Sequence, residues 1–341
     1  MDGFARFDAR RRAGLFDEAG ARRGVSSIII EKDFWVCWAL KHLFAHADAA
    51  AFIFKGGTSL SKAFGVIRRF SEDIDVSIDR KMLGYAGDRD PSAAPSGTKA
   101  QQLLKSLGQD LETYLRDTLL PAVTDGMRDA LGTNEGWQLS LEAEAVIDFH
   151  YPASIDASRY EEIGYVRPLV RFEFGARGEM WPSESKTVIA YVAEELPSVF
   201  STPDTRVHVL AAERTFWEKV TLLHAEAHRP AASAPADRLS RHHYDLAMMA
   251  DSEHGIRALE KTDLLRAVAE HKAVFFKSGW ARYDTARPGT LKLMPEAGRI
   301  AALKADYGKM TPMFFEAPPP FDEIMKRIAS LERAINDLPV R

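Results

Sequence analysis

The chain has 341 residues, of which 46% are hydrophobic and 28% charged, and this composition excludes an intrinsically disordered, collagen-like or disulfide-scaffolded protein. The 49 acidic and 45 basic residues give a formal net charge of −4, which excludes a general nucleic-acid coat protein but is compatible with a local basic cleft. The single cysteine, Cys37, can form neither an internal disulfide nor a cysteine-ligated zinc site. The sequence shows no secretory hydrophobic segment and no run of about 18 uncharged apolar residues, so it predicts a cytoplasmic protein that does not cross a membrane.

The first half of the chain is expected to be rich in strands. Residues 28–47 are expected to form a helix with a wide apolar stripe. Glu31, Lys32 and Asp33 lie in its first turn, where anions suit the helix dipole. A Gly- and Ser-rich loop is expected at 84–97, before a helix over 100–120. Short apolar or alternating segments predict strands at 51–54, 74–78, 138–149, 167–175 and 186–193.

The second half, after Pro203, is expected to be helical. Helical patterns cover residues 207–228, 241–250, 261–276 and 322–335. A second flexible loop, rich in Ala and Pro, is expected at 230–236. The change in composition predicts a catalytic domain of strands and helices over residues 1–200 and a helical domain over residues 201–341 that contributes to the active-site cleft.

A glycine pair follows the strand predicted at 51–54. Gly56 and Gly57 predict a tight turn, after which Thr58 or Ser59 caps a helix over residues 60–66. Such a turn lets the backbone approach a polyanionic phosphate closely, with N–H groups pointing at it.

Two aspartates open the next predicted strand. Asp73 and Asp75 lie two residues apart and therefore point to the same face of that strand. Two carboxylates on one face can hold Mg²⁺ together with substrate phosphates, and two such ions can clamp the oxygens of an in-line displacement. Each motif alone is weak, but the two together at this spacing favour phosphoryl-transfer chemistry.

These motifs resemble a known family. Residues 54–64, Phe-Lys-Gly-Gly-Thr-Ser-Leu-Ser-Lys-Ala-Phe, and residues 69–76, Arg-Phe-Ser-Glu-Asp-Ile-Asp-Val, are similar to the signature of the AbiEii/AbiGii-type nucleotidyltransferases. These are toxins of bacterial type IV toxin–antitoxin and abortive-infection systems. Residues 30–35 resemble the lead-in helix of the family. The close match spans about 30–80, and the resemblance implies an α+β fold with a polymerase β-like core, a mixed sheet with flanking helices, followed by a helical C-terminal domain.

The resemblance also implies roles for single residues. The residues implied in binding the nucleotide are Gly56, Gly57, Thr58, Ser59 and Lys219, and Lys55 and Lys62 are further candidates beside them. Those implied in binding Mg²⁺ or Mn²⁺ are Asp73 and Asp75. A third carboxylate is often present in the superfamily, and Glu173 is favoured over its rival, Asp148.

Two downstream helices match further family motifs. Lys219 follows Glu213-Arg-Thr-Phe-Trp-Glu, and Asp245 closes Arg241-His-His-Tyr-Asp. Lys219 is expected to neutralise charge on the triphosphate, and Asp245 to accept the proton of the acceptor hydroxyl or to order its ribose. The structural alternatives are a solvated position for Lys219 and an ion pair of Asp245 with Arg241 or Lys219.

The sequence thus predicts a metal-dependent nucleotidyltransferase toxin that moves a nucleotide from a nucleoside triphosphate to an acceptor hydroxyl. The resemblance implies an RNA acceptor, the 3′ end of tRNA, a block of translation and growth, and a cognate antitoxin. The alternatives are nucleotidylation of a protein hydroxyl and a non-catalytic module that binds nucleotide or antitoxin. A zinc site at His224 and His228 is not expected, because their spacing to Glu226 departs from His-Glu-x-x-His.

Overall fold

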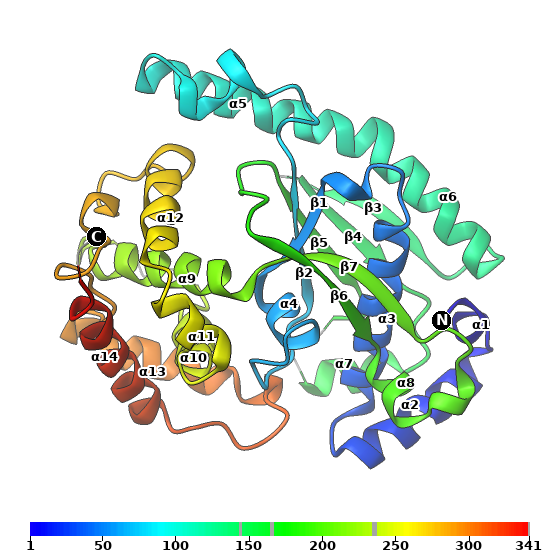
Figure 1. The fold of residues 1–341 in the computed structure, drawn as a ribbon. Helices are drawn as coiled ribbons and strands as arrows, with labels where there is room; N and C mark the ends of the chain where they lie inside the picture. The colour runs from blue at the N-terminus through cyan, green and yellow to red at the C-terminus, as the bar shows by residue number, and fades with distance from the viewer. Residues whose placement is uncertain (143–144, 164–166, 234–236, 340–341) are drawn as a thin grey trace. The chain divides into compact units, whose positions relative to one another are not determined.

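The chain folds into two compact units, as the computed structural model describes it for residues 1–142, 145–163, 167–233 and 237–339 (Figure 1). The first unit comprises Met1–Ala63, Phe70–Ala86 and Leu103–Leu210. The second unit comprises Phe64–Arg69, Gly87–Gln102 and Ala211–Arg341. The first unit therefore extends to Leu210, ten residues beyond the predicted boundary, and the second includes two segments from the first half of the chain.

A mixed sheet of seven strands forms the centre of the first unit in the described part of the chain, with the order β3-β4-β5-β2-β1-β7-β6. Its strands are β1 (Phe52–Lys55), β2 (Asp73–Ile78), β3 (Gln138–Glu142), β4 (Val146–His150), β5 (Val170–Gly175), β6 (Ser183–Ile189) and β7 (Asp204–Leu210). β2 pairs antiparallel with β1 and parallel with β5, and β1 pairs parallel with β7. This mixed sheet with flanking helices confirms the predicted α+β fold class.

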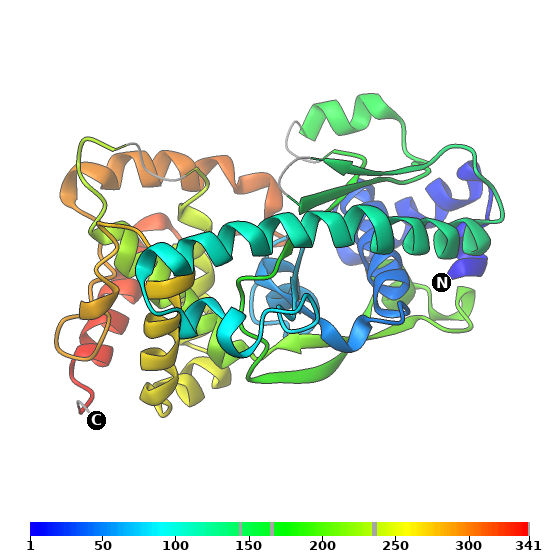
Figure 2. The ribbon, with the colours of Figure 1, turned by 90° about the horizontal axis from the view of Figure 1, so that it is seen from above.

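Helices surround this sheet. α3 packs against α2, β5 and β7, and it is buried along nearly its whole length. A π-helical turn, Leu115–Leu119, joins α5 to α6, so that the two form one continuous helical rod (Figure 2). The helices before the end of β7 are α1 (Asp2–Ala5), α2 (Ala9–Arg23), α3 (Ser27–Phe44), α4 (Gly56–Lys62), α5 (Gly97–Tyr114), α6 (Leu120–Leu131), α7 (Ala157–Ile163) and α8 (Tyr191–Glu195).

The second unit is helical. Its helices are α9 (Ala212–Ala227), α10 (Ser240–Ala250), α11 (Glu253–Leu259), α12 (Thr262–Phe275), α13 (Ile300–Lys309) and α14 (Phe321–Asn336). α9 packs against α10, α11 and α12, and α10 packs against α13 and α14. α9 buries one apolar stripe, which is formed by Phe216, Trp217, Val220 and Leu223.

Two predicted helix boundaries are wrong. The helix predicted over 207–228 begins only at Ala212, since residues 204–210 form β7 with alternating exposed and buried side chains. The helix predicted over 60–66 is α4, which begins at Gly56 with Lys55 at its N-cap and no side-chain cap. Thr58 and Ser59 thus lie inside the helix and do not cap it.

Other segments differ in detail from the predicted elements. The strand predicted over 138–149 is the antiparallel pair β3 and β4, and residues 143–144 lie outside the described residues. The segment predicted as a strand at 186–193 ends as β6 at Ile189 and continues as α8. Part of the loop predicted at 230–236, residues 234–236, also lies outside the described residues.

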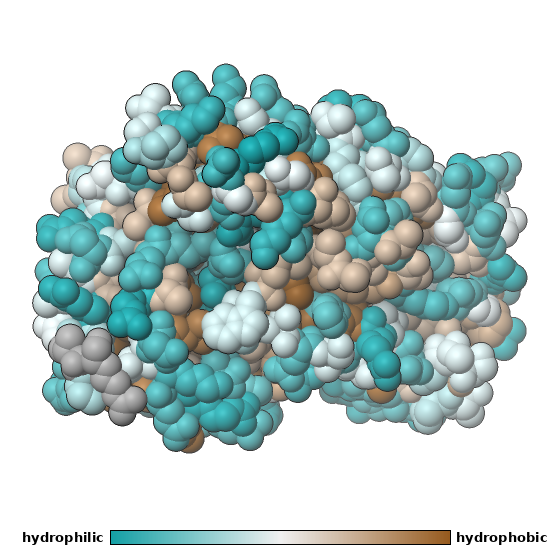
Figure 3. Space-filling view, turned by 45° about the horizontal axis from the view of Figure 1, so that its top comes forward, coloured by the Kyte–Doolittle hydropathy of each residue, from teal (hydrophilic) through white to brown (hydrophobic). Residues whose placement is uncertain are grey.

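The surface is mostly hydrophilic on the face that Figure 3 shows, with hydrophobic residues in small scattered spots. Among the described residues, Trp181, Ile256 and Phe276 are the large hydrophobic side chains with high exposure. No helix of the described residues has the length and apolar character needed to span a membrane.

Candidate active site

The glycine turn and the acidic strand are in direct contact. Lys55, the last residue of β1, pairs in register with Asp75 of β2. Gly56 follows with a φ of +77°, a backbone conformation that favours glycine. A Cβ atom at Gly56 would lie 1.9 Å from Oδ2 of Asp75. The absence of a side chain at Gly56 is therefore what allows the Asp75 carboxylate to lie against the start of α4.

Two buried hydroxyls hold α4 in place. The Thr58 hydroxyl donates a hydrogen bond to the backbone carbonyl oxygen of Asp73, and thereby ties α4 to the start of β2. The Ser59 hydroxyl donates to the carbonyl oxygen of Gly56 over 3.0 Å. Both side chains are at most 1% exposed. The nearby Lys55 is half-buried, and its Nζ lies 3.6 Å from the position that a Cβ at Gly178 would take.

The acidic residues of β2 have a third carboxylate beside them. Ile74 and Val76 are fully buried, whereas Asp73 and Asp75 are half-buried, as the alternation of a strand requires. On the neighbouring strand β5, Glu173 pairs in register with Asp75, and it is exposed. Three carboxylates thus occupy neighbouring positions on β2 and β5.

Asp148, the rival third carboxylate, has a different environment. Its two oxygens accept hydrogen bonds from Nε and Nη2 of Arg171, each over 2.8 Å, and its side chain is buried. The hydrogen bonds to Asp148 raise the pKa of Arg171, and burial lowers it by a smaller amount. The charges of Asp148, Asp73 and Glu173 also raise this pKa. The bidentate pair with Arg171 explains how the Asp148 carboxylate can be buried without a metal ion. Glu173, in contrast, lies beside Asp75.

In this structure, the described residues bring no group of three His, Cys, Asp or Glu side chains into an arrangement that could hold a metal ion by itself. Two carboxylates on one strand face nevertheless fit Mg²⁺, which uses few protein ligands and completes its shell with water and substrate phosphates. Asp73 and Asp75 fit this donor set, and Glu173 is placed to add a further oxygen.

Lys62 is not placed as predicted. Its Nζ lies 2.8 Å from Oδ1 of Asp33 and 3.5 Å from the centre of the Tyr191 ring, and its side chain is 5% exposed. Burial disfavours the charged form, but the Asp33 carboxylate outweighs this effect and raises the pKa of Lys62. A buried ammonium that already has a carboxylate partner has little surface for a phosphate, which argues against the predicted contact between Lys62 and the triphosphate.

In the second unit, Asp245 is the centre of a buried ion-pair network. Its side chain has no exposed surface. Arg69 donates to both carboxylate oxygens, from Nε over 2.7 Å and from Nη2 over 2.8 Å. Lys219 donates from Nζ over 2.9 Å. Of the two partners predicted for Asp245 in an ion pair, the structure shows Lys219, and the strongest partner, Arg69, was missed by the sequence analysis.

The charges and the burial of this network set the protonation of Asp245 and of the neighbouring His242. Burial alone would raise the pKa of the Asp245 carboxyl, but the two cations outweigh burial and hold the pKa well below its usual range. Burial, together with Lys219 and Arg241, lowers the pKa of His242 well below its usual value. Asp245 is therefore ionised and His242 neutral at physiological pH. A carboxylate with so low a pKa is a weak proton acceptor, which argues against Asp245 as a general base.

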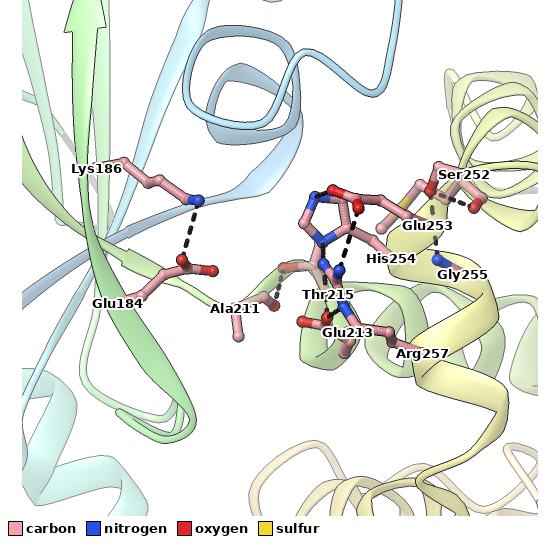
Figure 4. Close-up of polar contacts among 11 residues, drawn as sticks. Glu184, Lys186, Ala211, Glu213, Thr215, Ser252, Glu253, His254, Gly255 and Arg257 are labelled. Atoms are coloured by element: carbon pink, nitrogen blue, oxygen red, sulfur yellow. Dashed lines mark hydrogen bonds and ion pairs between the residues drawn. The ribbon is translucent and has the colours of Figure 1, made fainter.

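Glu213, the charged residue within the apolar stripe of α9, also has partners in the second unit (Figure 4). Its Oε1 accepts a hydrogen bond from Nε of Arg257 over 2.7 Å and lies 3.6 Å from Nδ1 of His254. Both partners lie on α11, so the cluster joins α9 to α11 and has a structural role.

His224 is held by backbone groups. Its Nδ1 accepts a hydrogen bond from the backbone N–H of Lys292 over 3.0 Å, so its Nε2 carries the proton and donates to the carbonyl oxygen of Arg282 over 2.9 Å. Burial lowers the pKa of His224 to about 4. Both ring nitrogens thus have partners within the second unit.

Comparisons with known proteins agree with the motifs. A family model described as nucleotidyl transferase AbiEii toxin, type IV toxin–antitoxin system, matches residues 38–327. Among solved structures, MenT4, a nucleotidyltransferase toxin from Mycobacterium tuberculosis H37Rv, has a similar fold with a TM-score of 0.51. The two are 15% identical over 96% of this chain and 90% of that chain. No curated protein sequence matches the chain.

Proposed function

Because the chain belongs to the AbiEii family of nucleotidyltransferase toxins, we propose that it transfers a nucleotide from a nucleoside triphosphate to an acceptor hydroxyl and releases pyrophosphate. In this reaction the acceptor oxygen forms a bond to the α-phosphorus, and the bond between that phosphorus and the bridging oxygen of pyrophosphate breaks. The observation that carries the proposal is the contact between Gly56 and the Asp75 carboxylate, because it brings the two halves of the family motif together.

The residues of the first unit supply binding and orientation. Asp73 and Asp75 are proposed to hold Mg²⁺ or Mn²⁺, with Glu173 as a third oxygen donor. When bound, the ion neutralises charge on the triphosphate and on the leaving pyrophosphate. We propose that Lys55 and the first turn of α4 cradle the phosphates. This first turn consists of Gly56, Gly57, Thr58 and Ser59. Lys62 is left out of this set because of its pair with Asp33.

The proposed roles of Lys219 and Asp245 come from the matched motifs and from their ion pair. Lys219 is proposed to balance the charge of the triphosphate. Asp245, buried between Lys219 and Arg69, is proposed to orient Lys219 rather than to accept a proton. Catalysis of this kind depends on positioning and charge stabilisation more than on a strong base.

The proposed acceptor is RNA, at the 3′ end of tRNA. Modification of that end blocks translation and growth, and a cognate antitoxin counteracts the toxin in the cytoplasm. The alternative acceptor is a protein hydroxyl, and a non-catalytic module is the third candidate.

A single experiment separates these candidates. The purified protein is incubated with each nucleoside triphosphate, labelled at the α-phosphate, and Mg²⁺, with total RNA in one set of reactions and total protein in another. Label in RNA supports the proposal, label in protein favours the alternative, and label in neither contradicts transferase activity. Asp75→Ala should abolish the label, whereas Asp125→Ala, which removes an exposed carboxylate paired with Arg128, should leave it unchanged.

A further inference from the structure

Three consecutive charged residues of α3 are buried inside the first unit. Glu31, Lys32 and Asp33 are exposed by 0%, 2% and 1%. Charged side chains are seldom buried unless each has a partner, because the loss of hydration is costly. The sequence predicts that they lie in the first turn of a helix over residues 28–47. Their burial needs another explanation.

Each of the three has its own partners in the first unit. Glu31 accepts hydrogen bonds from the backbone N–H of Ser154 over 2.6 Å and from the Tyr160 hydroxyl over 2.7 Å. Lys32 forms an ion pair with Glu72. Asp33 forms its ion pair with Lys62 and also accepts a hydrogen bond from the backbone N–H of Tyr191 over 2.6 Å.

The partners of Lys32 and Asp33 lie at the ends of the two motif elements. Glu72 directly precedes Asp73, the first residue of β2, and Lys62 is the last residue of α4. The chain leaves the first unit after Ala63 and returns to it at Phe70. Asp33 therefore pairs with Lys62, just before the chain leaves the first unit, and Lys32 pairs with Glu72, just after the chain returns to it.

Glu72, the partner of Lys32, is the direct chain neighbour of Asp73, the first carboxylate of the proposed metal site. Burial lowers the pKa of Lys32, while the charges of Glu72 and Asp73 act in the opposite direction. Glu31 differs from its two neighbours, since its partners lie around residues 154–160 and away from both motifs.

We propose that Lys32 and Asp33 are positioning residues of the nucleotidyltransferase site, Lys32 fixing Asp73 and Asp75 through Glu72, and Asp33 fixing the glycine turn through Lys62. This inference rests on the proposed function. It makes α3 a support of the site that holds the metal-binding strand and the phosphate-binding turn in one relative position. α3 supplies the cation, Lys32, to one pair and the anion, Asp33, to the other, so neither residue can replace the other.

The test compares Lys32→Met and Asp33→Asn with Glu31→Gln, a matched control on the same helix with the same burial. The readouts are melting temperature, Mn²⁺ affinity by electron paramagnetic resonance in the presence of a non-hydrolysable triphosphate analogue, affinity for that analogue, and kcat and KM per folded molecule. Lys32→Met should weaken Mn²⁺ binding by about tenfold or more, as loss of a group that orients a metal ligand does. Asp33→Asn should mainly weaken binding of the analogue and raise KM. Glu31→Gln should lower the melting temperature and leave the affinities and kinetics unchanged.

Two further variants keep the test decisive if Lys32→Met does not fold. Lys32→Arg keeps the charge and should retain most of the Mn²⁺ affinity. The double variant Lys32→Met/Glu72→Gln removes both charges and should recover folding without recovering Mn²⁺ affinity, because no ion pair then links α3 to the residue that precedes β2.

The outcomes separate this inference from the proposed function. If the unmodified protein transfers nucleotide but Lys32→Met and Asp33→Asn behave like Glu31→Gln, the positioning inference is overturned and the proposed function stands. If the unmodified protein binds Mn²⁺ and analogue but labels no acceptor, the proposed transfer fails, and the binding data still decide on positioning. If it binds neither ligand, both are overturned.

Discussion

The Asp245 network offers a quantitative test of how the second unit is stabilised. Asp245→Asn removes one negative charge and leaves the buried side chains of Arg69 and Lys219, 3% and 9% exposed, without their shared carboxylate. Breaking a buried ion pair by removing one partner costs about 3–5 kcal/mol. Because whole domains are stable by only about 5–15 kcal/mol, the loss is a large part of the total.

The assay is urea unfolding at pH 7, followed by tryptophan fluorescence and by circular dichroism. Glu213→Gln is the control, since it breaks an ion pair whose cationic partner, Arg257, is 41% exposed, and it should cost less than Asp245→Asn. The double variant Asp245→Asn/Lys219→Met should recover part of the loss, because one of the two unpaired cations is gone. A loss below about 1 kcal/mol for Asp245→Asn would refute this account of the network.

The pH dependence of the same variant has a defined sign. The pKa of Asp245 is lower in the folded chain than in the unfolded chain, so the unfolded chain binds the proton more readily. The stabilisation is complete above the ordinary aspartate pKa of about 3.9 and is lost as the pH falls below it. The stability difference between the unmodified protein and Asp245→Asn should therefore be constant from pH 8 to pH 5 and shrink at lower pH.

Further predictions concern the two motifs and His224. Gly56→Ala should abolish transfer, because its Cβ would displace the Asp75 carboxylate, whereas Gly24→Ala, with a similar φ of +73° and open space around it, should cost only about 1–2 kcal/mol of backbone strain and keep activity. Chelation with EDTA should stop transfer and Mg²⁺ or Mn²⁺ should restore it; transfer that continues in EDTA would contradict the proposed role of Asp73 and Asp75. His224 has a folded pKa of about 4, below the ordinary value of about 6.5, so its contribution to stability is complete above pH 6.5 and falls between pH 6.5 and 4. Its ring protons should titrate near pH 4 by NMR, and a midpoint near 6.5 would show that the ring is not buried as described.

The local chemistry of the first motif could be read from sequence because it depends on neighbours along the chain. Alternation along β2 placed Asp73 and Asp75 on one face, and the glycine pair marked the end of β1, although α4 begins at Gly56 itself and not at residue 60. Alternation also identifies β7, in which the buried Thr205, Val207 and Val209 alternate with exposed residues, but the predicted helix over 207–228 was extended back across this segment. The pairing of β7 with β1 and β6 shows that it is a strand.

The long-range ion pairs could not be predicted in the same way. Arg69 and Asp245 are 176 residues apart, and nothing in the spacing of either residue indicates the other. Lys62 was predicted to contact the triphosphate, and no buried partner was predicted for Lys32 or Asp33, since charged residues usually are exposed. For Lys32 and Asp33, the sequence did contain a signal, because Ile28 to Ile30 precede them and Phe34 to Val36 follow them. Such a continuous apolar surrounding predicts burial and hence partners.

The most direct test of the central claim measures transfer of the α-phosphate label and release of pyrophosphate side by side for the unmodified protein, Asp75→Ala and Asp125→Ala. The account predicts equal amounts of incorporated nucleotide and released pyrophosphate for the unmodified protein and Asp125→Ala, and neither product for Asp75→Ala, with all three proteins folded. Full transfer by folded Asp75→Ala, or no transfer by the unmodified protein with any of the four nucleoside triphosphates and either acceptor pool, would contradict it.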